Sequence, residues 1–190
     1  MSGESVDESI WGQLADLKEK VLAAKVDITL PSMFEIACAH SGEVLSPIRY
    51  FTEKETFMRA AAVAEIFRYA MLVYVLRIIH PPSSTLIPEI QDAVQSAIDL
   101  FPLVPDVIGP GSNLGWAYVV IGVELTEAEQ REYIWCRLQS LHSLALQNVD
   151  SAEKVLKAAW KNRDDSRLGL AEYGHWQDLM RILDIEQILI

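Results

Sequence analysis

The sequence predicts an all-α protein, a single domain built as a multi-helix array of about six to eight helices. The chain has 190 residues, of which 51% are hydrophobic and 23% charged, so it can bury a core as one domain. Apolar residues recur at helical spacing in nearly every long segment. One continuous apolar run could form a strand, but no second run is suited to pair with it, and an isolated strand would leave its backbone groups unpaired. These observations together favour helices throughout.

An amphipathic helix is predicted from about Asp7 to Lys25. Its apolar residues repeat at helical spacing, and charged residues lie on the opposite side. The next segment has no sustained period and contains prolines and a glycine, so we expect a connector that could hold one short helix at Met33–His40. The apolar residues of the first helix are Ile10, Trp11, Leu14, Leu17 and Val21.

A long helix is predicted to follow and to end at Ile79. Thr52 and Glu55 have the spacing of a capping box, and neither glycine nor proline occurs between them and Ile79. The second half of this segment is apolar nearly all round, interrupted by Arg68 and Arg77. A helix without a polar face must be enclosed by other helices.

The next two predicted helices form the middle of the core. The first runs from Thr85 to Phe101, with Pro88 tolerated in its first turn and Ile90, Val94, Ala97, Ile98 and Phe101 inward. The second is the apolar run from Ser112 to about Leu125, with Ser112 as its cap. This run is too short to cross a membrane, since a spanning helix needs about 20 apolar residues.

The last third of the chain predicts a further group of helices. Thr126 and Glu129 have capping-box spacing, and Glu127 precedes Arg131 by four residues, which favours an intrahelical ion pair. Another helix is expected to start at Asp150 or Ser151, and a last one at about Ala171. The apolar end of the chain is expected to dock on the body. The residues predicted to face inward are Ile134, Leu138, Leu141, Ala145, Ala152, Val155, Leu156, Ala159, Trp160, Trp176, Leu179, Met180 and Leu183.

Charge and cysteine content restrict the functional classes. Acidic residues outnumber Lys plus Arg by 27 to 16, and the net charge of −11 repels a phosphate backbone, so we expect no direct binding of nucleic acid by this chain. Cys38 and Cys136 are the two cysteines, too few for a disulfide framework or a multi-cysteine zinc cluster. The acidic start lacks the pattern of a secretory signal. We therefore expect an intracellular protein.

Several motifs in the second half resemble the fungal-specific transcription factor domain of zinc-cluster regulators. They are "LGWAYVVIGVEL", "EQREYIWCRLQSL", "KVLKAAW" and "HWQDLMRILDIEQILI". More loosely, the resemblance includes "EIFRYAMLVYVLRII" and "LIPEIQDAV", so that it covers roughly 57–190. The matching positions are Trp116, Gly122, Arg131, Glu132, Trp160, Trp176 and Met180.

The resemblance implies an all-α regulatory region located downstream of a DNA-binding module. It divides the single domain, 1–190, into a variable stretch over 1–50 and a family-like helical core over 51–190. The family's six-cysteine zinc cluster and basic linker are not present in this sequence. Two interpretations stay open: the chain is the effector part of a longer regulator, or it is a stand-alone relative without DNA binding.

Catalytic and metal-binding patterns are weak. No two of the histidines His40, His80, His142 and His175 are spaced as a zinc pair on one helix, so no metal site is predicted. The serine in "GPGSN" lacks the strand-turn-helix context of a nucleophile elbow. No phosphate loop or dinucleotide fingerprint occurs, and we expect no cofactor and no catalytic residues.

The candidate ligand-binding residues are Arg68, Tyr74, Trp116 and His175. An arginine within an apolar helix could orient an anion, although it more often reaches the surface or pairs with a carboxylate. His175, before the final helix, could lie at a pocket mouth or be an ordinary polar residue at a helix entry. Aromatic residues could line an apolar cavity, although plain core packing is the better explanation of their helical spacing. The aromatic set is Phe67, Tyr69, Tyr74, Trp116, Tyr118 and Trp160.

Two functional hypotheses follow. The first is a non-catalytic regulatory domain, located in the nucleus or cytoplasm, that senses a hydrophobic small molecule or a protein partner, including a second copy of itself. The second is a biosynthetic enzyme or carrier that uses the same helical scaffold around an apolar cavity. The sequence favours the first hypothesis, because the resemblance is to regulators and no catalytic group stands out.

Overall fold

The computed structural model of the protein describes residues 8–26, 53–80, 87–104, 109–142, 149–167 and 176–185. Over these ranges the chain forms seven α-helices and two short 3-10 helices, without a β-strand, and the predicted all-α fold class is confirmed. The α-helices are α1 (Glu8–Ala23), α3 (Glu53–Ile79), α4 (Pro88–Leu100), α5 (Gly115–Gly122), α6 (Ala128–Leu141), α7 (Val149–Arg167) and α8 (Trp176–Ile182). The 3-10 helices are η1 (Phe101–Leu103) and η2 (Gly109–Leu114).

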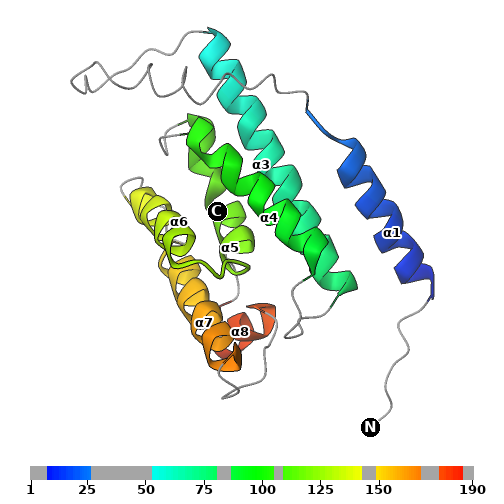
Figure 1. The fold of residues 1–190 in the computed structure, drawn as a ribbon, viewed down its shortest axis with the longest axis vertical. Coiled ribbons are helices and arrows are strands. Elements are labelled where there is room, and N and C mark those ends of the chain that lie inside the picture. Colours follow the sequence, from blue (N-terminus) through cyan, green and yellow to red (C-terminus); the bar gives the residue numbers. More distant parts are fainter. Residues whose placement is uncertain are drawn as a thin grey trace.

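The helices are arranged in two groups around α5 (Figure 1). Helices α1, α3 and α4 lie side by side in one group, and α6, α7 and α8 form the other. Helix α5 contacts α3 on one side and both α6 and α7 on the other. The short α8 packs against α7. The eight-residue helix α5 therefore joins the two groups.

Helix α5 is the apolar run that the sequence singles out, and its helical conformation is confirmed. Every residue of α5 except Trp116 is buried, as expected for a helix without a polar face. Its bounds are narrower than predicted, because the preceding turn is the 3-10 helix η2 and the α-helix ends at Gly122. The predicted cap was wrong: the N-cap is Leu114, which makes no side-chain capping hydrogen bond.

Gly122 sets how closely α5 approaches its neighbours. A Cβ atom built at this position would lie 2.8 Å from Cδ2 of Leu156 in α7 and 3.2 Å from Cγ2 of Ile134 in α6. The indole Nε1 of Trp160 donates a hydrogen bond of 2.7 Å to the Gly122 carbonyl. The last residue of α5 is thus packed closely against α6 and α7, and its carbonyl is hydrogen-bonded to Trp160.

Helix α4 is confirmed, although it begins at Pro88 and not at the predicted Thr85. Ile87, with extended backbone angles, is its N-cap, and Pro88 occupies the first turn, where its missing N–H costs no helical hydrogen bond. The predicted inward residues Ile90, Val94 and Ala97 are buried. The chain then continues into η1, whose Phe101 packs against Tyr118 of α5 with ring centroids 5.1 Å apart. Pairs at this spacing add to the energy of area burial alone.

The capping prediction for α6 was wrong. Its N-cap is Glu127, without a side-chain capping bond, while the Thr126 hydroxyl donates to the Glu127 carboxylate at 3.3 Å. The predicted Glu127–Arg131 ion pair is also replaced, since the Arg131 guanidinium binds Asp164 of α7 at 2.8 and 3.0 Å. Arg131 therefore pairs with a residue of another helix and not with Glu127 one turn before it. Thr52, of the other predicted capping box, lies outside the described residues, directly before the first residue of α3.

Helix α1 is confirmed, but its apolar side is largely uncovered. Val21 is buried, whereas Ile10, Trp11 and Leu17 are 45%, 42% and 41% exposed. The helix packs against α3, and Lys18 adds a 2.7 Å ion pair with Glu89 of α4. The amphipathic spacing therefore predicted the helix correctly. It also predicted that the apolar residues of α1 would be buried, and most of them are more exposed than that.

The predicted helices near the end of the chain are confirmed as α7 and α8. Ala152, Val155, Leu156 and Ala159 of α7 are buried, as expected. Trp176, Leu179 and Met180 of α8 pack partly buried against the core, while Leu183 is 39% exposed. The expected short helix at Met33–His40 and the docking of the final apolar residues concern positions outside the described ranges. Over the residues that the structure describes, none of the helices combines the length and the apolar character needed to span a bilayer.

Candidate functional site

Four aromatic side chains from three helices meet at the surface between α3, α5 and α8. Phe67 and Tyr74 belong to α3, Trp116 to α5 and Trp176 to α8; we call them the aromatic cluster. The Trp116 ring is stacked on Phe67 and tilted against Tyr74, with both pairs of centroids 6.2 Å apart. Tyr74 also lies 6.4 Å from Trp176. Trp116 and Tyr74 are therefore the two central members.

Helix geometry explains why these residues meet. Phe67 and Tyr74 are seven positions apart, about two turns, so they project from the same side of α3. Met71, between them on that side, is 39% exposed. Trp116 is the second residue of α5 and Trp176 the first of α8, so each ring stands at the start of its helix beside α3. All four rings are partly buried, unlike the fully enclosed core aromatics Tyr118 and Phe101.

The aromatic cluster has the chemical character of an apolar binding surface. Partly buried rings present flat apolar faces, and the Tyr74 hydroxyl and the indole nitrogens add polar groups at their edges. Ligand sites commonly combine several apolar and aromatic side chains with a few polar groups. A planar hydrophobic molecule or an apolar side chain of a protein could stack here.

The structure brings together two of the predicted ligand-binding residues. Tyr74 and Trp116 are in contact in the aromatic cluster. His175 lies outside the described residues, although the next residue, Trp176, contacts Tyr74. Arg68 belongs to a different contact, described next. Whether any of these residues binds a ligand stays a prediction.

Arg68 is paired with a carboxylate from its own helix. Its guanidinium makes three hydrogen bonds of 2.8 to 3.0 Å to Glu65, and the carboxylate also accepts the Val26 N–H at 2.6 Å. Both side chains are buried. Burial by itself raises the pKa of Glu65, but the bonds from Arg68 and Val26 outweigh it and hold that pKa below its ordinary value. The pair thus ties the segment after α1 to α3.

Arg77 is paired in the same way, but across the fold. Its Nε and Nη2 donate to the two carboxylate oxygens of Glu124, just beyond α5, at 2.7 and 2.6 Å. Arg163 of α7 binds the same carboxylate at 2.9 Å and the Glu124 carbonyl at 2.8 Å. Burial alone would raise the pKa of Glu124; the hydrogen bonds and charges of Arg77 and Arg163 outweigh it and lower the pKa. We call Arg77, Glu124 and Arg163 the buried ion triad.

Sequence reasoning did not identify the buried ion triad. A signal was available: Glu124 ends an apolar run, and a buried carboxylate requires a cationic partner. The carboxylate-pairing alternative for Arg68 and Arg77 is nevertheless the one that the structure shows. Both arginines therefore have structural roles in this conformation.

The other members of the predicted aromatic set are dispersed. Tyr118 is fully buried, and its hydroxyl accepts hydrogen bonds from Arg137 at 3.2 and 3.3 Å. Trp160 bonds to Gly122 and packs edge-on to Trp135 at 6.4 Å. Tyr69 lies 4.1 Å from the Arg68 guanidinium. Plain packing accounts for these positions, and the candidate site is restricted to the aromatic cluster.

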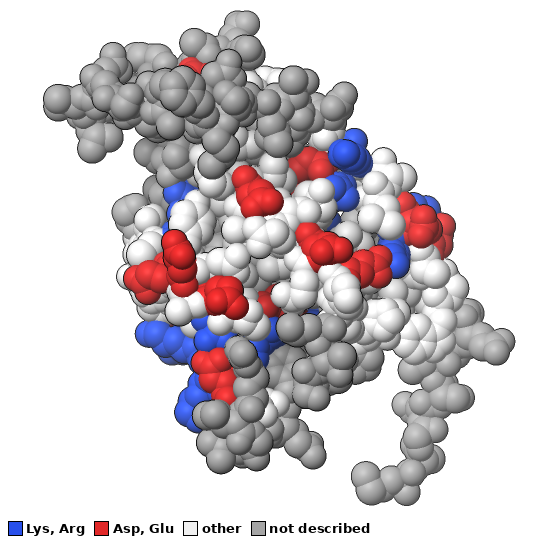
Figure 2. All heavy atoms as spheres, viewed as in Figure 1, with Lys and Arg blue, Asp and Glu red and all other residues white. Residues whose placement is uncertain are grey.

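On the face that Figure 2 draws, the charge of the described residues is mixed. Figure 2 shows acidic and basic side chains interspersed over the face in view, with a group of basic ones over α7. Among the described residues visible on this face, the basic side chains do not form one continuous area.

Comparison with known proteins identifies the family. The sequence profile of the fungal specific transcription factor domain matches residues 15–190. No curated protein and no solved structure matches the chain. The profile match covers the second part of α1 and all the described helices that follow it, including the aromatic cluster and the buried ion triad. The chain therefore belongs to the fungal-specific transcription factor domain family.

Proposed function

We propose that this domain is the sensing part of a transcriptional regulator and that it binds a hydrophobic, planar small molecule at the aromatic cluster. The family gives the domain its regulatory role in transcription. The observation that supports a ligand is the contact between Tyr74 and Trp116, two partly buried rings from different helices at the surface. DNA recognition would be supplied by a different part of the regulator, in keeping with a net charge of −11. The site of action would be the nucleus or the cytoplasm.

The proposed mechanism depends on the helices that carry the aromatic cluster. A ligand can shift a protein only by as much as its affinity differs between two conformations. A molecule stacked on Tyr74, Trp116 and Trp176 would touch α3, α5 and α8 at once and would favour the arrangement in which these helices are closest. Because α5 also contacts α6 and α7, that preference would extend to the second group of helices.

A binding experiment with matched variants tests the proposal. The probes are 8-anilinonaphthalene-1-sulfonate and a panel of neutral planar aromatic compounds, and the readouts are fluorescence and the melting temperature of the full chain. We expect the best compounds to bind Tyr74→Ala and Trp116→Phe about tenfold more weakly, a loss of about 1.4 kcal/mol. Trp11→Ala is the control, since Trp11 is 42% exposed on α1, outside the aromatic cluster.

The outcomes separate the alternatives. Equal binding by Tyr74→Ala and the wild type would place any small-molecule site elsewhere and contradict the proposal. If no compound binds, the hydrophobic-ligand proposal fails and a protein partner becomes the next hypothesis. Circular dichroism of each variant distinguishes loss of the site from loss of the fold.

The alternative of an enzyme or carrier stays a prediction. Incubation of the purified chain with biosynthetic intermediates, followed by product analysis, tests it directly, and unchanged product profiles would count against catalysis.

A further inference from the structure

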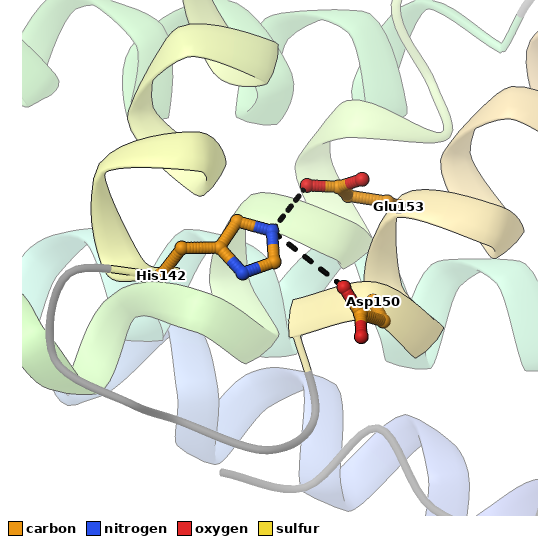
Figure 3. A group of neighbouring side chains, drawn as sticks. All are labelled: His142, Asp150 and Glu153. Atoms are coloured by element: carbon orange, nitrogen blue, oxygen red, sulfur yellow. Dashed lines mark hydrogen bonds and ion pairs between the residues drawn. The ribbon is translucent and has the colours of Figure 1, made fainter.

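A cluster of potential metal ligands lies between the end of α6 and the start of α7 (Figure 3). The Nε2 atom of His142 faces Glu153 Oε1 at 2.8 Å and Asp150 Oδ1 at 3.7 Å. One ligand atom from each of these residues lies within 4.8 Å of the other two. We propose that His142, Asp150 and Glu153 form a binding site for a divalent transition-metal ion of the zinc class, linking α6 to α7.

The helices position these side chains. His142 is the C-cap of α6, and Asp150 and Glu153 stand three positions apart in the first turns of α7, on the same side of that helix. The antiparallel packing of α6 on α7 then brings the end of one helix to the start of the other. Ligands carried by two packed helices are held more firmly than ligands on loops.

The donor types select the class of metal. An imidazole nitrogen with two carboxylate oxygens suits zinc and its first-row neighbours, whereas calcium and magnesium prefer oxygen ligands alone. Metal–ligand distances of about 2.0 to 2.2 Å in a tetrahedral site place ligand atoms about 3.3 to 3.6 Å from one another. The 2.8 and 3.7 Å distances from His142 Nε2 bracket this range. The carboxylate oxygens of Asp150 and Glu153 lie within 4.8 Å of each other, so side-chain rotations would bring all three ligand atoms to one ion.

Asp150 distinguishes this arrangement from a simple hydrogen-bonded pair. Its oxygen faces the same nitrogen as Glu153 but lies beyond hydrogen-bonding distance, so the His142–Glu153 contact does not require it. A cation placed between the three side chains would use all of the converging donors.

The surroundings favour a bound cation. The Gln139 amide donates to the Glu153 carboxylate and holds it in place, as groups around metal ligands commonly do. The last turn of α6 carries no basic residue, and its negative end meets the positive end of α7 here, so the two helix dipoles offset each other. The side chains of His142 and Asp150 are 39% and 75% exposed, so an ion can enter and water can complete its coordination.

Calorimetric titration of the full, tag-free chain with zinc chloride tests the site. We expect one ion per chain with a micromolar dissociation constant, and binding at least about tenfold weaker in His142→Ala and Glu153→Gln, comparable to the loss of a major ligand interaction. His80→Ala and Cys136→Ser are the controls, because His80 and Cys136 are exposed potential donors outside the cluster. Both controls should bind zinc as the wild type does, and magnesium chloride should not bind at this site.

A second readout separates a metal site from a plain ion pair. Zinc should raise the melting temperature of the wild type and of both controls but not of His142→Ala, since binding to the folded state alone stabilises it. Equal zinc binding by wild type and His142→Ala, or loss of binding in Cys136→Ser, would overturn the proposal. So would a His142→Ala variant that melts earlier while zinc leaves the wild type unchanged. None of these results depends on the aromatic cluster, so the two proposals fail separately.

Discussion

Arg77 of α3 binds both carboxylate oxygens of Glu124, at 2.7 and 2.6 Å, in the interior of the protein. Arg163 of α7 reaches the same carboxylate. One acidic side chain therefore holds together helices from both groups around α5, and its removal should affect the whole fold.

Glu124→Gln is expected to lower the free energy of unfolding by about 3–5 kcal/mol, because it leaves two buried guanidinium groups without their shared negative charge. Urea denaturation followed by circular dichroism measures this change. Glu129→Gln is the control, since Glu129 is exposed in the first turn of α6 and its replacement should change the free energy by less than about 0.5 kcal/mol. Similar effects of the two substitutions would contradict the structural role of the buried ion triad.

Acid should destabilise the protein through the same residue. The pKa of Glu124 is lowered in the folded state, so the unfolded chain binds more protons at moderately acid pH. The resulting stability is complete above the ordinary glutamate pKa of about 4.3 and is lost as pH falls from there towards the lowered pKa. Urea denaturation at a series of pH values should show that the free energy of unfolding falls less steeply with decreasing pH for Glu124→Gln than for the wild type. Glu65, whose pKa is also lowered, should account for part of the remaining slope.

Two glycine-to-alanine substitutions should have opposite effects. Gly122→Ala places a Cβ 2.8 Å from Leu156 in a filled core, and we expect a loss of about 1–3 kcal/mol. Gly12→Ala, inside α1 with nothing within 4 Å of the new atom, should gain about 0.5–1 kcal/mol from helix propensity.

A double substitution tests the cause of the Gly122 effect. If the Leu156 side chain is the obstacle, Gly122→Ala should cost less in a Leu156→Ala background than alone. Additive losses, measured by thermal or urea denaturation, would show that the close approach at Gly122 is not the reason.

Arg131 should contribute more to the stability of the fold than Asp164, its ion-pair partner. Its guanidinium bonds the Leu125 carbonyl at 3.0 Å and lies 5.6 Å from the Trp160 ring, in addition to pairing with Asp164. We expect Arg131→Ala to cost about 1–2 kcal/mol and Asp164→Asn less than about 1 kcal/mol, since Asp164 is half exposed. Urea denaturation in low and high salt measures both. A larger loss for Asp164→Asn would reverse this interpretation.

Much of the helical fold could be predicted, because burial leaves a strong periodic signal. The apolar run at α5 was assigned as helix by excluding a membrane span and an unpaired strand, and the structure agrees. Its ends were less predictable, because η2 precedes it and the chain after Gly122 passes into tighter turns, in which the Glu124 N–H donates to the Ile121 carbonyl. Local motifs failed where tertiary partners competed: the spacing of Thr126 and Glu129 fits a capping box, yet α6 is capped at Glu127.

The candidate site was only partly predictable. Tyr74 and Trp116 were both named from their apolar context, but their contact depends on how α3 packs on α5, which no local pattern specifies. The His142 cluster could not be predicted from ligand spacing within one helix, because His142 and Glu153 come from two different helices. The sequence shows Glu124 at the end of an apolar run, but it does not show that Arg77 and Arg163 pair with this carboxylate.

The buried character of α5 also has a consequence for synthesis on the ribosome. Helix α5 is translated before α6 and α7, the two helices that cover one of its sides. Until residues up to about 167 have left the exit tunnel, one side of this apolar segment, which contains valine, isoleucine and tyrosine, stays exposed and can associate with other chains. Nascent chains stalled between α5 and α7 should therefore be the species most dependent on chaperones.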